Sequence, residues 1–166
     1  MPTKAHAKSI VENLRSRGET ISVAESLTGG GVGHALTQVP GASEVFVGGI
    51  IAYTSDVKVN FLGVKQSTID EHTVVSEAVA LEMAQGAIAR LGSTWAISTT
   101  GIAGPGDYMG IREGTVWISI CGPVCQTLQL TLDSGREGVR QGAISSAIGT
   151  FARILSYRTQ EGKGAQ

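Results

Sequence analysis

Apolar and polar positions in the first forty residues follow two periodicities in turn. Between residues 4 and 17, apolar side chains recur every three or four positions, which predicts a helix with one buried face that ends at Gly18. The run Thr20–Ala24 alternates and contains β-branched residues, so it is expected to be a strand. Three glycines, residues 29–31, then begin a short helix that Pro40 stops.

The middle of the chain continues this exchange of strand and helix. Residues 45–53, VFVGGIIAY, are apolar on both faces, which predicts a strand buried in the middle of a layered sheet. A cap cluster, Thr54–Asp56, begins a short helix that ends at Gly63, and Ser76 begins a longer helix that extends to about residue 91. The run Trp95–Thr99 is expected to be another buried strand.

The last third predicts a hairpin and a helix. The runs GTVWISIC and VCQTLQLTL alternate as strands do, and the intervening Gly-Pro indicates an antiparallel hairpin. A final helix is expected from about residue 137 to 157, followed by a disordered polar tail, 158–166. The whole pattern predicts a single domain, 1–157, with the fold of a three-layer α/β/α sandwich. Its sheet is expected to be mixed and mostly parallel, with the C-terminal hairpin antiparallel.

Composition narrows the possible partners. The 166 residues are 42% hydrophobic and 16% charged, which is typical of a soluble globular protein. A net charge of −1 gives no reason to expect nucleic-acid or membrane-surface binding. The first ten residues lack the apolar core of a signal peptide, so a cytoplasmic location is expected. The 23 glycines and the apolar helix faces favour a homo-oligomer.

Cysteine and histidine give no metal site. Cys121 and Cys125 flank the turn of the predicted hairpin, where a disulfide or half of a metal site is compatible with the spacing. Two free thiols are the preferred interpretation, because no further cysteine and no cluster of histidines accompanies them.

Three polar groups follow the predicted strands, namely Ser26 with Thr28, Tyr53 with Lys58, and Thr100 with Gly101. In open α/β sheets, ligands bind where the carboxyl ends of strands meet. A lysine with apolar neighbours, here Val57, Val59 and Phe61, can lose its charge by desolvation and deprotonate a serine. On spacing alone, a solvated Lys58 and a core Tyr53 are the preferred interpretation.

The glycine-rich turn after Ser26 is a candidate anion site. Backbone N–H groups near Thr28, Gly29 and Gly30, at the start of a helix, suit an oxyanion or a phosphate. A tight turn capped by Ser26 or Thr28 is the alternative. Arg136 and Arg140 are four residues apart at the start of the last helix, and one of them could direct a guanidinium into the site. The segment GIAGPGDYMG is interpreted as a functional loop at a strand end.

Several of these motifs, in order, resemble the CinA C-terminal domain family. They are AES-x-TGG, PGAS, GGIIAY with a lysine five residues after the tyrosine, LGV, VSE, TGIAGPG and GTVWI. The resemblance extends from about residue 5 to residue 155. It implies hydrolysis of the carboxamide of nicotinamide mononucleotide, giving nicotinate mononucleotide and ammonia, without a metal or an organic cofactor.

The resemblance also implies roles for individual residues. Ser26 matches the nucleophile and Lys58 the base of a Ser–Lys hydrolase. Tyr53, Thr100 and Arg140 match further family positions, and the Tyr53 hydroxyl is expected to assist catalysis. We expect the N–H groups near Thr28, Gly29 and Gly30 to hold the oxyanion, and Arg140 with the Thr100–Gly101 turn to hold the phosphate. The sequence leaves open which of the two glycine-rich turns binds which anion.

The chain departs from the family's pattern at two places. Leu27 replaces a frequent cysteine, and the loop from Asp107 to Glu113 lacks the usual Pro-Lys-Pro stretch. Two alternatives to an amidase follow: a pyridine-nucleotide-binding module that has lost the chemistry, and a structural or regulatory subunit whose glycines serve packing.

Overall fold

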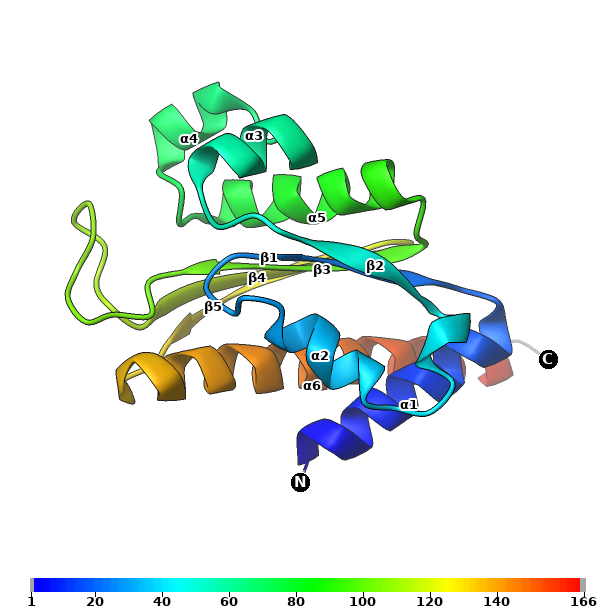
Figure 1. Cartoon of the computed structure of the whole chain (residues 1–166). Helices are drawn as coiled ribbons and strands as arrows, with labels where there is room; N and C mark the ends of the chain where they lie inside the picture. Colours follow the sequence, from blue (N-terminus) through cyan, green and yellow to red (C-terminus); the bar gives the residue numbers. More distant parts are fainter. Residues whose placement is uncertain (1, 165–166) are drawn as a thin grey trace.

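Helices cover both faces of one five-stranded sheet in the computed structural model, which describes residues 2–164 and the side chains of residues 3–160 (Figure 1). The strand order is β2-β1-β3-β4-β5. Their bounds are β1 Ile21–Glu25, β2 Phe46–Ile51, β3 Trp95–Gly101, β4 Thr115–Cys121 and β5 Cys125–Thr131. The first three strands are parallel, whereas β4 and β5 are antiparallel and form the predicted hairpin. The predicted α/β/α sandwich with a mixed sheet is therefore confirmed.

Two separate apolar cores lie between the sheet and the helices, one on each face of the sheet. One face carries α1 (Pro2–Arg17), α2 (Gly31–Thr37) and α6 (Gly135–Gly164), and the other carries α3 (Ser55–Leu62), α4 (Gln66–His72) and α5 (Glu77–Leu91) (Figure 1). In the first core the fully buried rings of Trp95 and Phe151 lie 5.1 Å apart between their centroids. The second core is smaller and lies under α3 and α5, around Met83 and Leu62. No helix within residues 2–164 has the length and apolarity needed to cross a membrane.

Helices α3 and α5 begin at the capping residues predicted from the sequence, and α3 ends at the predicted glycine. The Thr54 hydroxyl accepts a hydrogen bond from the Val57 N–H at the start of α3, and Gly63 ends this helix with a left-handed φ of 73°. Ser76 caps α5 in the same way. Helix α4 was not predicted, because only Ile69 of its seven residues packs against the core and its pattern carries no apolar stripe.

Strand β2 is an edge strand, so the prediction of a position in the middle of the sheet was wrong. Its residues are alternately half-buried and exposed, and the side chains of Val47 and Ile51 are 46% and 55% exposed. Strand β1 lies between β2 and β3 and takes the central place. A sequence run that is apolar on both faces therefore does not distinguish an edge strand from a central strand.

Two expectations about smaller features were also wrong. The tail expected to be disordered from residue 158 continues α6 as far as Gly164, and residues 165–166 lie outside the described range. Arg158 is paired with Glu19 at 3.2 Å and lies over the Trp95 ring, so this part of the tail has partners in the fold. Cys121 and Cys125 form a disulfide rather than two thiols, because the hairpin register places them directly opposite each other.

Candidate functional site

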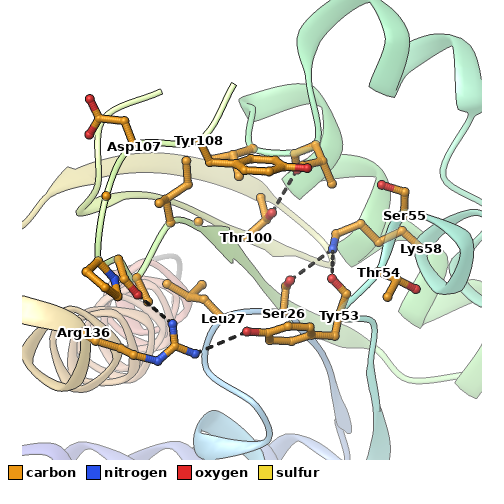
Figure 2. A pocket seen from close by; sticks show the side chains of 18 residues that line it. Ser26, Leu27, Tyr53, Thr54, Ser55, Lys58, Thr100, Asp107, Tyr108 and Arg136 are labelled. Carbon is orange, nitrogen blue, oxygen red and sulfur yellow. Dashed lines mark hydrogen bonds between the residues drawn. The ribbon is translucent and has the colours of Figure 1, made fainter. Parts of the chain in front are cut away.

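A cavity of about 570 Å³ opens where β1, β2 and β3 end (Figure 2). The sheet register aligns these ends, since Glu25, the last residue of β1, pairs with both Ile51 and Thr99. The segments that follow each strand therefore meet here, together with the start of α6. The lining residues used below are Ser26, Leu27, Tyr53, Lys58, Thr100, Gly101, Asp107, Tyr108 and Arg136. Within the described residues, no group of three or more His, Cys, Asp or Glu side chains could hold a metal ion.

Ser26 and Lys58 are in direct contact inside this cavity. The Lys58 Nζ lies 3.1 Å from the Ser26 Oγ, and it also donates to the carbonyl oxygens of Ala52, at 2.7 Å, and Tyr53, at 3.3 Å (Figure 2). Lys58 is 1% exposed although it belongs to a short surface helix. The side chain reaches inward beneath the β2–α3 connection, whose carbonyl groups hold its end.

Burial shifts the protonation equilibrium of Lys58 towards the neutral amine. Burial lowers the pKa of Lys58 to about 8 from its ordinary value of 10.5, because the charged form loses hydration. The three oxygens around Nζ belong to a hydroxyl and two carbonyl groups, none of which carries a charge. A neutral amine has two N–H groups and one lone pair. If the two carbonyls accept the N–H groups, the lone pair is left for the Ser26 hydroxyl proton.

A buried carboxylate, that of Glu25, occupies the start of α2. It accepts hydrogen bonds from the Thr28 hydroxyl at 2.6 Å and from the backbone N–H groups of Gly30, Val32 and Gly33 at 2.8–3.1 Å. Glu25 is completely buried. The positive end of the helix dipole therefore already has an anion, supplied by the chain itself.

Two backbone N–H groups of the glycine turn, where an oxyanion was expected to bind, are already bonded within the chain. The N–H of Gly30 is bonded to Glu25, and that of Gly29 is bonded to the Ser26 carbonyl at 3.1 Å. Thr28, Gly29 and Gly30 line a different hollow, on the far side of the turn between α2 and α6. The role of Glu25 was missed. Its position, a carboxylate ending a buried strand just before a helix, was the available signal.

Hydrogen bonds connect this carboxylate to the serine through two threonines. Because a carboxylate only accepts, the Thr28 hydroxyl must donate to Glu25, and the Thr99 hydroxyl must then donate to the Thr28 Oγ1 at 2.7 Å. The Ser26 N–H donates to the Thr99 carbonyl at 3.0 Å. The turn that carries Ser26 is thus fixed to both β1 and β3. Within the described residues, the N–H of Leu27, the next residue, has no partner in the chain.

The two arginines of α6 point to different places. Arg136 reaches the cavity, where it donates to the Gly104 carbonyl at 2.8 Å and to the Tyr53 hydroxyl at 3.4 Å (Figure 2). Arg140, the residue chosen from the sequence, lies behind the turn and donates to the carbonyls of Leu27 at 3.0 Å and Thr28 at 3.4 Å. It supports the turn and does not line the cavity.

The remaining predicted residues do line the cavity. Thr100 and Gly101 form part of its wall, although the Thr100 hydroxyl is already donated to the Val74 carbonyl at 2.9 Å. The exposed ring of Tyr53 forms another part. The structure therefore brings together Ser26, Tyr53, Lys58, Thr100 and Gly101, and it separates them from Thr28, Gly29, Gly30 and Arg140.

The chain matches the family model described as the CinA C-terminal domain over residues 3–155. A CinA-like protein of Prochlorococcus marinus (strain MIT 9313) is 40% identical over 153 residues, which are 90% of this chain and 36% of that relative. A CinA-like protein of Gloeothece citriformis (strain PCC 7424) is 52% identical over 113 residues, 68% of this chain and 27% of the relative. The chain spans about a third of the length of the curated relatives it matches.

Solved structures show the same architecture. The competence/damage inducible protein CihA from Agrobacterium tumefaciens superimposes with a TM-score of 0.89 at 31% identity, covering 94% of this chain and 96% of that one. The competence damage-inducible protein A from Klebsiella pneumoniae gives a TM-score of 0.89 at 29% identity, covering 93% and 97%.

Proposed function

The chain belongs to the CinA C-terminal domain family, and on that premise we propose that it hydrolyses the carboxamide of nicotinamide mononucleotide to nicotinate mononucleotide and ammonia. The observation that carries the proposal is the contact of 3.1 Å between the Ser26 hydroxyl and the buried amine of Lys58. A serine attacks an amide only if a base takes its proton, and a lysine with a pKa near 8 is neutral in a useful fraction of molecules at neutral pH.

The reaction proceeds by acyl transfer. Lys58 takes the Ser26 proton while the serine oxygen bonds to the carboxamide carbon, and the carbonyl electrons move onto its oxygen. The protonated lysine then gives this proton to the leaving nitrogen, so the C–N bond breaks and ammonia departs. Water, deprotonated by Lys58, attacks the resulting ester and releases the acid with return of the proton to Ser26. The cationic pyridinium ring withdraws electrons from the carboxamide and assists both attacks.

The N–H of Leu27 is our candidate for the oxyanion site. It follows Ser26 directly, Leu27 lines the cavity, and this N–H has no partner within the described chain. The amide of the residue after a nucleophile is a frequent oxyanion donor. One such donor contributes about 10²–10³ in rate.

Arg136 is our candidate for the phosphate, in place of Arg140. A guanidinium has five N–H groups, and Arg136, which lines the cavity, uses two of them in its hydrogen bonds within the described part of the chain. Its planar fork suits a phosphate. Because Arg136 donates a hydrogen bond to the Tyr53 hydroxyl, this candidate phosphate site lies beside a ring that lines the same cavity as Ser26 and Lys58.

The test is ammonia release from nicotinamide mononucleotide, measured with identification of nicotinate mononucleotide as the second product. Ser26→Ala and Lys58→Met are each expected to reduce turnover by about a hundredfold or more, which is roughly 2.7 kcal/mol of barrier. Ser43→Ala and Lys65→Met, which change the same residue types at exposed positions away from the cavity, are expected to retain wild-type turnover.

Two outcomes would overturn the proposal. Turnover that survives Ser26→Ala would show that another group attacks the amide. A wild-type protein that is stabilised by the nucleotide against heat but releases no ammonia would be a binding module. A ligand at a hundred times its Kd stabilises a protein by about 2.7 kcal/mol, so such binding is readily detected.

A further inference from the structure

Two tyrosine rings form walls of the cavity that contains Ser26 and Lys58. Tyr53 and Tyr108 are 58% and 56% exposed, and both line the cavity. Figure 2 shows the Ser26 hydroxyl and the Lys58 amine between the two rings in that view. Large aromatic side chains exposed inside a cavity, rather than packed in a core, are available to a ligand.

Tyr108 owes its position to an ordered loop. The backbones of Tyr108 and Ile111 exchange hydrogen bonds of 3.0 and 2.9 Å, which closes a tight turn at the tip. The Glu113 carboxylate accepts the Gly106 N–H, and the Glu113 N–H donates to the Asp107 carboxylate at 2.9 Å. The base of the loop is therefore bonded to itself on both sides of Tyr108, which holds the ring over the cavity.

The loop side of the cavity offers an aromatic face to a ligand. The charged residues from Asp107 to Glu113 are these two carboxylates and the cation Arg112. Both carboxylates accept backbone N–H groups of the loop, and Arg136 donates to the Gly104 carbonyl of the same loop. The attraction for a cation therefore comes from the ring, because the face of an aromatic ring attracts a cation through its quadrupole.

We propose that Tyr108 is a specificity-determining residue whose ring packs against the substrate's heteroaromatic ring and selects a cationic, oxidised pyridinium over an uncharged, reduced one. The identity of that ring rests on the proposed function. Selection of this kind matters for the reaction, because only the cationic ring withdraws electrons from the carboxamide. Tyr108 makes the electrophilic form of the substrate also the form that binds.

Tyr108 acts on binding and takes no part in proton transfer. Its ring stacks on the pyridinium while Ser26 and Lys58 address the carboxamide. Removal of the ring should therefore raise the Kd and KM for the cationic substrate and leave kcat nearly unchanged. An uncharged ring gains no cation–π attraction, so it should lose little when Tyr108 becomes an aliphatic residue of similar bulk.

The experiment measures calorimetric binding of oxidised and reduced nicotinamide mononucleotide to the whole chain carrying Ser26→Ala, so that neither ligand is consumed. Adding Tyr108→Leu should raise the Kd of the oxidised nucleotide by about 3- to 30-fold, the range that cation–π energies give. The Kd of the reduced nucleotide should change by less than about twofold on the same reasoning. Tyr108→Phe should preserve the preference, because it keeps the ring.

Met109→Ala is the matched control, since Met109 lies on the same loop, is 66% exposed and does not line the cavity. It should leave both dissociation constants unchanged. An equal loss for both nucleotides in Tyr108→Leu, an unchanged Kd for the oxidised one, or no binding of either by the parent would overturn the inference. Ammonia release by the wild type is measured separately. A binder without turnover therefore refutes the proposed function alone, and turnover without a Tyr108 effect refutes this inference alone.

Discussion

At the scale of one residue, Lys58 shows what the sequence predicts about the site and what it does not. Its position five residues after Tyr53 favoured, on spacing alone, a solvated helix residue, and only the family resemblance implied that it is the base beside Ser26. Apolar neighbours were expected to remove its hydration, yet Phe61 is 60% exposed. Burial comes instead from the β2–α3 connection, whose carbonyls surround Nζ. That connection is a tertiary feature with no local pattern.

The two arginines illustrate a limit of the same kind. Arg136 and Arg140 are one helical turn apart, so both belong to one face of α6 and periodicity cannot choose between them. Only the path of the loop after β3 and of the turn after β1 decides which guanidinium meets the cavity. The glycine turn is a similar case. Glu25 ends a buried strand just before a helix, but this position alone does not show that its carboxylate accepts the N–H groups of α2.

Glu25→Gln tests the carboxylate at the start of α2. The amide keeps the size of the side chain but replaces one acceptor by a donor, which then faces N–H or hydroxyl donors. A buried hydrogen-bonding group left without its partner costs about 1–3 kcal/mol, and we expect a loss of stability of this size in urea unfolding. We also expect kcat to fall more than KM rises, since the turn positions Ser26.

Glu12→Gln is the control for this substitution, because the pair that Glu12 forms with Lys8 on α1 is exposed. Exposed pairs contribute little, so its stability and turnover should remain those of the wild type. A Glu25→Gln protein with wild-type kcat would show that the carboxylate does not position the serine.

At the scale of elements, the ends of helices were predicted better than the contacts that each element makes in the fold. Thr54, Gly63 and Ser76 delimit α3 and α5 as expected, because capping is local chemistry. The edge position of β2 and the continuation of α6 past residue 157 were not predicted, because both depend on contacts between distant segments. Arg158 and Glu19, for example, are 139 residues apart.

Gly86→Ala tests the contact between α5 and the helix that carries Lys58. Alanine ordinarily stabilises a helix interior relative to glycine, by up to about 1 kcal/mol. A Cβ at Gly86 would, however, overlap the backbone carbonyl of Leu62 at the end of α3. We expect a net loss of about 1–3 kcal/mol in thermal or urea unfolding, as overpacking gives, and lower turnover because α3 must move.

Gly149→Ala is the matched control in α6. Its Cβ would meet only the His6 ring at 3.5 Å, an ordinary contact, so the substitution should be neutral or stabilising. If Gly86→Ala is as stable and active as Gly149→Ala, the close approach of α5 to α3 does not hold Lys58 in place.

At the scale of the whole molecule, the sheet decides where chemistry is possible. Parallel strands β1, β2 and β3 end at one edge of the sheet. The segments after β1 and β2 supply Ser26 and Tyr53 with Lys58 to a single cavity, and the end of β3 supplies Thr100. The alternation of helix and strand was sufficient to predict this arrangement. The division of the polar residues between two hollows, one on each side of the turn after β1, depends on the turn's three-dimensional path and could not be predicted.

The central claim is that neutral Lys58 activates Ser26, and the pH dependence of kcat/KM for nicotinamide mononucleotide tests it most directly. The lysine acts as a base only when unprotonated, and its pKa is lowered to about 8. The rate should therefore rise as pH increases, with a midpoint near 8, and reach a plateau above it. The residual activity of Lys58→Met should not show this rise of kcat/KM with pH. A rate that is flat across this range, or that falls as pH rises through 8, would contradict the account.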